Sequence, residues 1–243
     1  MDLRIYRKMA EVERHHWWFA GRRTVVSHQI RRRKLPPDAE ILEVGCGTGG
    51  NIDMLRRFGR LHACEPEPEA LRIARQRHPN VSIEPGSLPD DLPFGSDRFD
   101  LIVLTDVLEH IVDDTAALRA TRRRLRPGGH LIATVPAHPW LWSEHDAAHH
   151  HVRRYRRRDL AAAARGAGLR TSVLTHYNAL LLPLAVADRL VLHRSHDVSM
   201  DEMQLPHPAL NAMLRAVFAS ERYWIGRLPV PAGISLLLVA RAP

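Results

Sequence analysis

The sequence of 243 residues is poor in cysteine, in lysine and in long hydrophobic runs. Its two cysteines, Cys46 and Cys64, are too few for a disulfide framework, so we expect reduced thiols and no metal site built on them. No segment reaches the roughly 18 consecutive apolar residues that span a bilayer. The first 33 residues also lack the apolar core of a signal peptide. We therefore expect a cytoplasmic protein.

Lysine is scarce, but positive charge is not. The chain has 35 basic and 27 acidic residues and a net charge of +8, and only Lys8 and Lys34 are lysines. Such a balance is compatible with an anionic partner, either nucleic acid or a lipid surface. The arginine bias can equally reflect codon usage. Because no RNA- or DNA-binding module is recognisable, nucleic acid is not an expected partner.

A glycine-rich turn after a short apolar segment is the most informative feature of the chain. Residues 41–44 are typical of a buried parallel strand, and Gly45, Gly47 and Gly50 then match the G-x-G-x-x-G pattern. The helix expected to start near Gly49 would point free N–H groups at a ligand in the turn. The pattern alone is weak evidence, but it favours a nucleoside ligand.

Two further strand ends support a nucleoside site. A strand over residues 61–64 ends at Glu65, about 20 residues after the turn, where a carboxylate accepts hydrogen bonds from ribose hydroxyls and repels a 2′-phosphate. A strand over residues 81–84 is followed by Ser87 and Leu88, which could bracket an adenine ring. Both ends should meet at the same edge of a parallel sheet.

Strand and helix patterns alternate along the rest of the first 140 residues. Buried strands are expected over residues 99–105 and 130–135, the second after the turn at residues 126–129. This alternation indicates a parallel sheet with right-handed crossovers, an α/β fold. Helices are expected at residues 52–58, 69–77, 113–125, 159–167 and 210–224.

Four segments in this order resemble the motifs of class I S-adenosylmethionine-dependent methyltransferases. They are ILEVGCGTGGN, HACEPEPEAL, FDLIVLTDVLEHI and LRPGGHLIATVP, and they cover about residues 40 to 136. The resemblance implies a Rossmann-like sheet of seven strands with the last antiparallel, in which residues 169–175 and 234–241 supply strands six and seven. We expect one domain over residues 1–243. Its parts would be a helical lid (1–38), a cofactor-binding core (39–175), a helical insertion (176–232) and the last strand (233–243).

The resemblance also implies roles for individual residues in binding S-adenosylmethionine. Gly45, Gly47 and Gly49 would form the floor under its amino-acid part, and Glu43 would support that loop. Glu65 would hold the ribose. The remaining implied contacts are Pro66 packing on the adenine, Ser87 and Leu88 at the adenine edge, and backbone near Thr105 at the methionine end. Many members carry Asp where this chain has Ser87, and a hydroxyl is a weaker acceptor.

The segment before the first strand is expected to be one helix over residues 1–35, stopped by Pro36 and Pro37. It carries the sequence HHWWFAGRR at residues 15–23. Both tryptophans could simply fasten the helix to the body. Alternatively the helix is a lid in which Trp18 covers the cofactor and Arg22 or Arg23 meets its carboxylate.

Candidate catalytic residues lie in two loops expected above the sheet. His110 closes the loop after strand four, and His145 and Asp146 lie in a loop that resembles the H-D…H-x-R-R-Y signature of a bacterial subset of these enzymes. They could act as a base or orient the acceptor, or serve only loop structure. A metal site is not expected, because the consecutive residues His149 to His151 converge poorly on one ion.

Two other segments leave alternatives open. The arginines of residues 153–158 could hold a phosphate or carboxylate of the acceptor, or start a solvated helix. Within the insertion, residues 178–192 are strongly apolar and interrupted by Pro183. They could form a buried helix, pair two subunits as a homodimer, or contact a membrane surface or a lipid-like acceptor.

The sequence thus predicts an S-adenosylmethionine-dependent methyltransferase that acts on a small-molecule or lipid-linked acceptor, with oxygen as the first candidate for the accepting atom. An NAD-dependent oxidoreductase is one alternative, suggested by the glycine pattern and Glu65. A cofactor-binding scaffold without activity is another, suggested by Ser87 and by the lack of one clear base.

Overall fold

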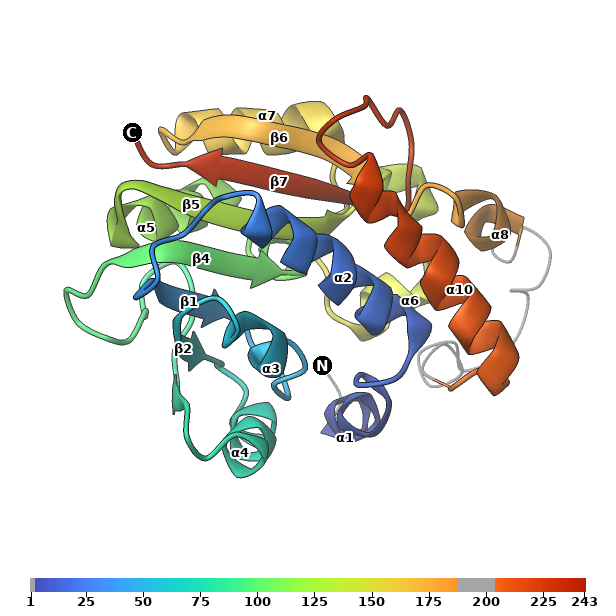
Figure 1. Cartoon of the computed structure of the whole chain (residues 1–243), viewed down its shortest axis with the longest axis horizontal. Helices are drawn as coiled ribbons and strands as arrows, with labels where there is room; N and C mark the ends of the chain where they lie inside the picture. The colour runs from blue at the N-terminus through green and yellow to red at the C-terminus, as the bar shows by residue number, and fades with distance from the viewer. Residues whose placement is uncertain (1–2, 188–203) are drawn as a thin grey trace.

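The computed structural model describes residues 3–187 and 204–243. Its centre is a seven-stranded sheet in the order β3-β2-β1-β4-β5-β7-β6 (Figure 1). Strand β7 runs antiparallel to both of its neighbours, and the pairs on the other side of β5 are parallel. The expected α/β fold with an antiparallel last strand is confirmed. The strands are β1 Glu40–Val44, β2 Arg60–Cys64, β3 Ser82–Glu84, β4 Phe99–Thr105, β5 Leu125–Pro136, β6 Arg170–Tyr177 and β7 Ser235–Arg241.

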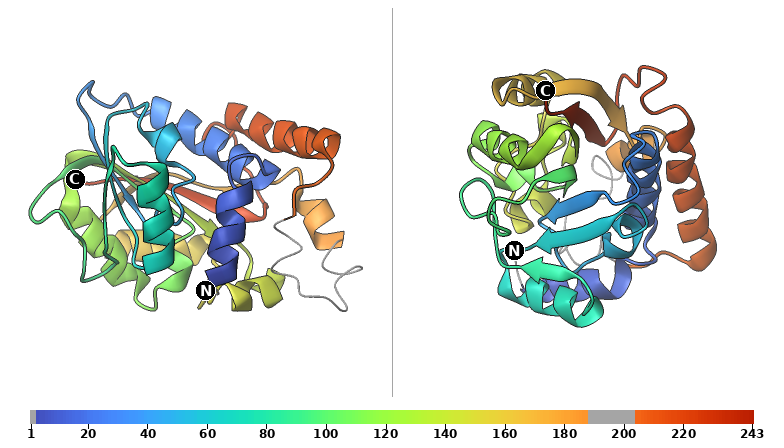
Figure 2. Two further views of the ribbon diagram at one scale, coloured as in Figure 1. Left: turned by 90° about the horizontal axis from the view of Figure 1, so that it is seen from below. Right: turned by 60° about the vertical axis from the view of Figure 1, so that its left-hand side comes forward.

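Helices cover both faces of the sheet, and each face has its own apolar core (Figure 2). Helices α5 and α7 pack on one face, and α2, α3 and α10 pack on the other. The central strands read as continuous apolar runs because both of their faces are buried. The α-helices are α1 Leu3–Val12, α2 Trp17–Arg31, α3 Ile52–Leu55, α4 Pro68–Arg77, α5 Asp114–Arg124, α6 Glu144–Ala148, α7 Arg157–Gly166, α8 Leu182–Ala187 and α10 Pro208–Ser220.

The N-terminal segment forms two helices, so the expectation of one helix over residues 1–35 was wrong. The chain breaks between α1 and α2, and the ring of His16 caps α2 by accepting a hydrogen bond from the Trp18 backbone N–H at 3.3 Å. The break lets α1 turn toward the glycine-rich loop while α2 lies on the sheet. The sequence does not reveal this break, because no Gly or Pro stands between the two helices.

Two smaller boundaries also differ from expectation. Residues 126–129 belong to β5 rather than to a turn before it, and a register shift between Phe99 and Leu101 accommodates the extra residues. Strand β6 continues to Tyr177, so its last two residues lie in the segment that we had assigned to the insertion.

The insertion packs on the N-terminal segment. Helix α10 lies beside α2 in both views of Figure 2, and the two helices are in contact. The buried ring of Phe218 meets the rings of Trp17 and Trp18, with centroids 6.3 and 5.6 Å away. Asn211 of α10 accepts a hydrogen bond from the Trp17 N–H at 2.8 Å and donates one to the His15 carbonyl at 2.9 Å. Both tryptophans therefore help to fasten α2 to α10.

Part of the apolar stretch at residues 178–192 forms the short helix α8, whose Leu184 side chain is 59% exposed. Residues 178–181 precede this helix, with Asn178 and Leu181 buried. Residues 188–192 lie outside the described residues, as do residues 197–202, which the sequence predicts to be a polar linker. Within residues 3–187 and 204–243, no helix combines the length and apolarity that crossing a membrane requires.

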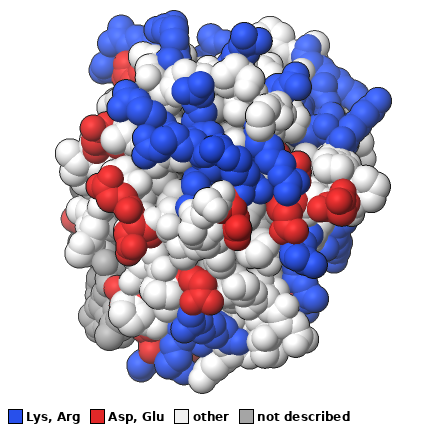
Figure 3. Space-filling model, turned by 90° about the vertical axis from the view of Figure 1, so that its left-hand side faces the viewer, with Lys and Arg blue, Asp and Glu red and all other residues white. Residues whose placement is uncertain are grey.

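Basic side chains gather away from the carboxyl ends of the parallel strands. Figure 3 shows a band of Lys and Arg across the opposite end of the molecule, with fewer acidic groups beside it. Arg60 at the start of β2, Arg126 near the start of β5 and Arg241 at the end of β7 belong to this end of the sheet. Much of the positive charge therefore lies far from the edge where an α/β sheet binds its ligand.

The packing of α10 on α2 can be tested through Phe218. Replacing this fully buried ring by alanine (Phe218→Ala) should lower the free energy of unfolding by about 3–5 kcal/mol, because the transfer energy is lost and a cavity remains. Urea denaturation measures the change. Met213→Ala on the same helix, where the side chain is 54% exposed, should change it by less than about 0.5 kcal/mol. Equal losses in the two variants would contradict this packing.

Candidate functional site

The glycine-rich loop lies where β1, β2 and β4 end, at the carboxyl edge of the sheet. Its backbone enters the left-handed region at Gly45 (φ +69°) and Gly49 (φ +92°), which side chains rarely adopt. A Cβ at Gly45 would stand 2.7 Å from the Val107 side chain, and one at Gly49 would stand 2.8 Å from the His78 ring. Glycine is therefore required both by conformation and by packing.

Glu65 ties this loop to the end of β2. Its side chain is only 5% exposed, and its two oxygens accept hydrogen bonds from the N–H groups of Gly47 at 2.8 Å and Glu67 at 3.1 Å. Burial raises the pKa of Glu65. Since each carboxylate oxygen has two acceptor sites, one remains on each oxygen for a ligand hydroxyl.

Beneath the loop, Glu43 belongs to a buried polar group that sequence reasoning had found only in part. Asn51 donates to Glu43 at 2.8 Å and to the Thr105 hydroxyl at 3.0 Å, which links β1, the loop and β4. Asn51 had been missed, because a lone Asn after a glycine turn carries no specific signal. Burial raises the pKa of Glu43 to about 8, although the Asn51 hydrogen bond acts in the opposite sense.

Arg22 is buried beside the site, but its guanidinium is paired with Asp106. Asp106 follows β4 in the left-handed region (φ +58°) and also accepts a hydrogen bond from the Thr134 hydroxyl at 2.9 Å. The Nε atom of Arg22 is buried and has no hydrogen-bond partner among the described residues. To meet a cofactor carboxylate, Arg22 would have to share its charge with Asp106.

Helix α1 lies on the glycine-rich loop, as a lid over the cofactor would. Beyond its end, the buried Glu13 carboxylate accepts a hydrogen bond from the Thr48 hydroxyl at 2.7 Å and pairs with Arg77. Tyr6 lies near Glu65, and burial together with that carboxylate raises the pKa of its phenol. The residues of α1 had not been assigned to the site, because nothing in their sequence indicates a ligand.

The other expected cofactor contacts are placed as follows. Trp18 is half-buried against Phe218, and Pro66 is exposed directly after Glu65. Ser87 pairs through its backbone with Asp91, by hydrogen bonds of 2.8 and 3.1 Å, and Leu88 is buried in the core. Their contacts with a cofactor remain predictions.

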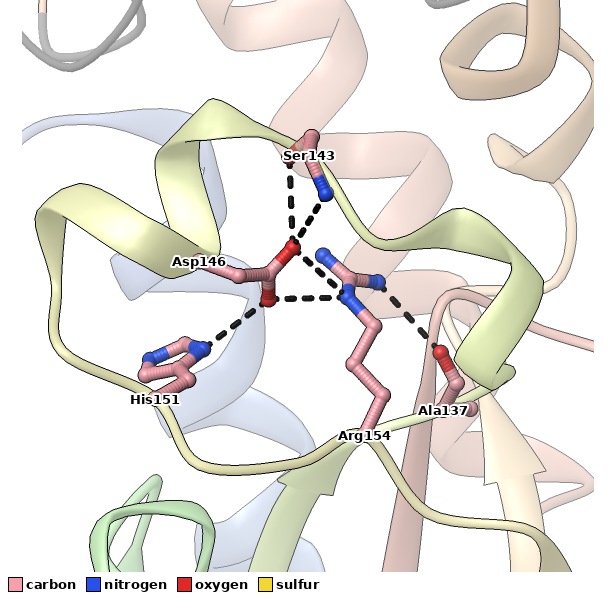
Figure 4. Close-up of polar contacts among 5 residues, drawn as sticks. All are labelled: Ala137, Ser143, Asp146, His151 and Arg154. Atoms are coloured by element: carbon pink, nitrogen blue, oxygen red, sulfur yellow. Dashed lines mark hydrogen bonds and ion pairs between the residues drawn. The ribbon is translucent and has the colours of Figure 1, made fainter.

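Asp146 is the centre of the loop between β5 and α7 (Figure 4). Its carboxylate accepts hydrogen bonds from Arg154 Nε at 2.8 and 2.9 Å, from His151 Nδ1 at 2.9 Å and from the Ser143 N–H at 2.9 Å. Burial opposes its charge, but the donors outweigh that effect and hold the pKa of Asp146 well below its usual range. Because it is fully buried and both of its oxygens are already taken by these donors, this carboxylate is placed to orient its neighbours.

The arginines and the tyrosine of the loop signature have structural partners. Buried Arg154 also donates to the Ala137 carbonyl at 3.3 Å, and Arg153 pairs with Asp114 at 3.2 Å. The Tyr155 hydroxyl donates to Asp114 at 2.9 Å. Arg156, Arg157 and Arg158 are exposed, on the start of α7. These contacts explain much of the H-D…H-x-R-R-Y signature as a folded loop.

Four histidines meet above the carboxyl edge. The rings of His110 and His151 lie 4.8 Å apart and those of His145 and His149 lie 4.2 Å apart. Although His110 as a residue is exposed, desolvation of its ring by the groups packed around it, with His151 as the next contribution, lowers its pKa to about 4. Glu109 beside them is fully buried, and burial raises its pKa well above the ordinary value. The structure thus brings His110 and His145 to one cluster, and adds Glu109 and His151, which we had not assigned to catalysis.

Fold and site together define a seven-stranded nucleoside-binding domain of the methyltransferase type. A family model described as "Methyltransferase domain" matches residues 18–173, which is more than half of the chain. The chain therefore belongs to this methyltransferase-domain family.

Curated relatives agree with this membership. A protein named as a probable S-adenosylmethionine-dependent methyltransferase of Mycobacterium tuberculosis is 29% identical over 134 residues, covering 54% of this chain and 46% of the relative. A ubiquinone biosynthesis O-methyltransferase of Xanthomonas oryzae pv. oryzae is 32% identical over 102 residues, covering 40% and 43% of the two chains. The matches thus span about half the length of these relatives.

Solved structures show the same fold. A chain of the complex between the Haloferax volcanii Trm112 methyltransferase activator and a methyltransferase is 22% identical, with a TM-score of 0.63 and coverage of 98% of this chain and 93% of that one. The geranyl diphosphate C-methyltransferase from Streptomyces coelicolor A3(2) is 14% identical, with a TM-score of 0.61 and coverage of 90% and 75%. At these identities the likeness concerns the fold alone.

The raised pKa of Glu43 predicts a stability that depends on pH. Between its ordinary value near 4.5 and about 8, the folded state holds a proton that the unfolded state has lost, so stability falls as pH rises through this range. Glu43→Gln removes this contribution. It should therefore make the decrease of the free energy of unfolding with pH less steep, by up to about 1.4 kcal/mol per pH unit. Urea denaturation from pH 5 to pH 8, the range these two values bracket, measures it.

Glu11→Gln is the matched control, because this side chain on α1 is 67% exposed. It should leave the slope of the wild-type protein unchanged. If Glu43→Gln also leaves the slope unchanged, Glu43 is ionised in the folded state and the buried polar group has been misjudged.

Proposed function

We propose that this protein transfers a methyl group from S-adenosylmethionine to a small-molecule or lipid-linked acceptor, and that oxygen is the accepting atom. The observation that carries the proposal is Glu65, held at the end of β2 by the glycine-rich loop with acceptor positions left for ribose hydroxyls. Membership of the methyltransferase-domain family supports it.

The residues at the carboxyl edge fit the charges of this cofactor. The glycine backbone of the loop presents no side chain to a ligand, and Arg22 Nε at the same end of the sheet is a buried polar atom without a hydrogen-bond partner among the described residues. The carboxylate in the amino-acid part of the cofactor suits the Arg22 guanidinium. Helix α1 with its Tyr6, together with Glu13 just beyond its end, would close over the bound nucleoside and exclude water.

The cofactor, when bound, supplies an activated methyl group on a sulfonium. Catalysis then requires the acceptor oxygen to lie in line with the C–S bond, so that the O–CH₃ bond forms as the C–S electron pair returns to sulfur. The hydroxyl proton must leave the acceptor. The four-histidine cluster, composed of His110, His145, His149 and His151, lies above the same edge and would receive that proton or assist its loss.

Exposed apolar side chains beside the cluster favour an apolar acceptor. Trp140 is 65% exposed, Trp142 46% and Val152 47%, and all three belong to the loop that carries Asp146. An acceptor with a lipid tail would cover them, and the same residues would touch a membrane surface in which that tail is embedded. The similarity to a ubiquinone biosynthesis O-methyltransferase supports an acceptor of this chemistry.

Glu65→Gln tests the cofactor assignment. Glutamine keeps the shape and one acceptor oxygen but loses the charge, so affinity for S-adenosylhomocysteine, measured by isothermal titration calorimetry, should fall by about tenfold or more. Glu84→Gln, at the end of the adjacent strand and 44% exposed, should bind as the wild type does. Titration with NADH distinguishes the oxidoreductase alternative, because preferential binding of the dinucleotide would overturn the proposal.

Isotope-labelled S-adenosylmethionine tests the acceptor class. Incubated with the protein and a cell extract, it should yield a labelled O-methyl product in the lipid-soluble fraction, identified by mass spectrometry. Labelled product only on nitrogen, or only among water-soluble compounds, would contradict the oxygen or the lipid assignment respectively. Absence of any product alongside tight S-adenosylhomocysteine binding would favour a scaffold.

A further inference from the structure

Glu109, His110 and His151 converge above the carboxyl edge, although two come from the turn after β4 and one from the loop before α7. One carboxylate oxygen of Glu109 and one ring nitrogen of each histidine lie within 4.8 Å of one another. Two imidazoles and one carboxylate form a donor set that binds divalent transition metals in preference to Mg²⁺ or Ca²⁺. The sequence had suggested no such site, because His149 to His151 alone converge poorly.

Glu109 has no evident role without a cation. It is fully buried, and neither of its carboxylate oxygens has a hydrogen-bond partner among the described residues. A buried carboxyl group without a partner is costly, whereas a metal ion beside it would satisfy the oxygens. This burial separates Glu109 from the exposed acidic groups that are common on protein surfaces.

His151 is held in the orientation that a metal ligand needs. Its Nδ1 lies 2.9 Å from Asp146, a carboxylate that can only accept, so Nδ1 carries the hydrogen and Nε2 is left as the free donor atom. Asp146 is fixed in turn by Arg154 and Ser143. A carboxylate that orients a histidine in this way is the usual outer partner of a metal-binding imidazole.

Hydrogen bonds lock the two segments together. The Val152 N–H donates to the Glu109 carbonyl at 2.8 Å, and the buried Tyr155 hydroxyl, whose hydrogen points to Asp114, lies 3.2 Å from the Leu108 carbonyl. Ligand atoms about 2.1 Å from one ion stand roughly 3–3.5 Å apart. The three candidate ligand atoms, which lie within 4.8 Å of one another, therefore have to approach by no more than about 1–2 Å.

We propose that Glu109, His110 and His151 bind one divalent transition-metal ion, with Asp146 as the residue that positions His151. His110 is exposed and His151 partly so, which leaves coordination positions open on the solvent side. As far as catalysis is concerned, the inference rests on the proposed function. There, an acceptor hydroxyl bound at an open position would lose its proton more easily, and His110 would serve as a ligand instead of a free base.

Metal titration of the full chain, expressed without a polyhistidine tag and freed of metal by chelator, tests the site. Co²⁺ should bind one site and produce the visible absorption of a nitrogen- and oxygen-ligated ion, and Zn²⁺ should displace it in calorimetry. Glu109→Gln, His110→Gln and His151→Gln should abolish the Co²⁺ spectrum. Asp146→Asn, provided that circular dichroism shows it folded, should weaken binding by about 10–100-fold.

His150→Asn is the matched control. His150 is exposed, lies next to His151 and has φ +56°, a conformation that Asn tolerates. This variant should bind Co²⁺ as the wild type does. Equal loss in His150→Asn, or unchanged binding in Glu109→Gln or His151→Gln, would overturn the metal site.

S-adenosylhomocysteine binding separates the two proposals. Glu109→Gln should keep the wild-type affinity for S-adenosylhomocysteine, because the substitution lies on the acceptor side of the site. We expect a change of no more than about twofold, which corresponds to about 0.4 kcal/mol. If the wild type binds Co²⁺ but not S-adenosylhomocysteine, the cofactor assignment fails and the metal site stands. If it binds S-adenosylhomocysteine but gives no Co²⁺ spectrum, the metal site fails alone.

Discussion

The hydrogen bond from the Gly47 N–H to the Glu65 carboxylate joins the two parts of the molecule on which its function depends. It draws the loop after β1 onto the end of β2, and the left-handed glycines make so close an approach sterically feasible. Because parallel strands present their carboxyl ends at one edge, everything attached to those ends gathers around this bond. Helix α1, Glu43 beneath the loop and the histidines of the four-histidine cluster are all placed near this bond.

The site is unusually rich in buried ionisable groups, and the structure deals with them in two ways. Arg22 with Asp106, and Asp146 with Arg154 and His151, are paired, so their charges are offset by close partners. Glu43 and Glu109 retain buried oxygens that have no hydrogen-bond partner within the part of the chain that the structure describes. A buried ionisable group without a partner lowers the stability of the folded protein. Such groups are found at functional sites, where a bound ligand supplies the missing partner. The unpaired atoms therefore mark where cofactor and cation would enter.

Much of the fold could be predicted from the chain. The run of residues 99–105 is apolar because both faces of β4 are buried, and the order of strand ends is set by connectivity. The side-chain pairs across the site could not be predicted from the sequence. Asn51, Asp106 and Glu109 are ordinary residues in sequence, and only their neighbours in space, from other strands and loops, give them a role. The break between α1 and α2 was also missed, because no helix-breaking residue marks it, and the contact of Glu13 with Thr48 beside the break forms only in the folded chain.

The sequence by itself determined the alternation of strands and helices, the glycine turn and the acidic strand end, because these depend on local backbone preference and on hydrophobic periodicity. Only the tertiary structure decided that Asp146 is a buried anchor, that Arg22 is already paired, and that His110 meets His151. Arg22 and Asp106 are 84 residues apart in the sequence, and His110 and His151 also come from distant segments. The partners of Asp146 are local, within 8 residues, but its burial depends on how its loop packs on the rest of the protein. These contacts and this burial are set by how elements dock, and docking depends on the shape of the whole core, which no local pattern contains.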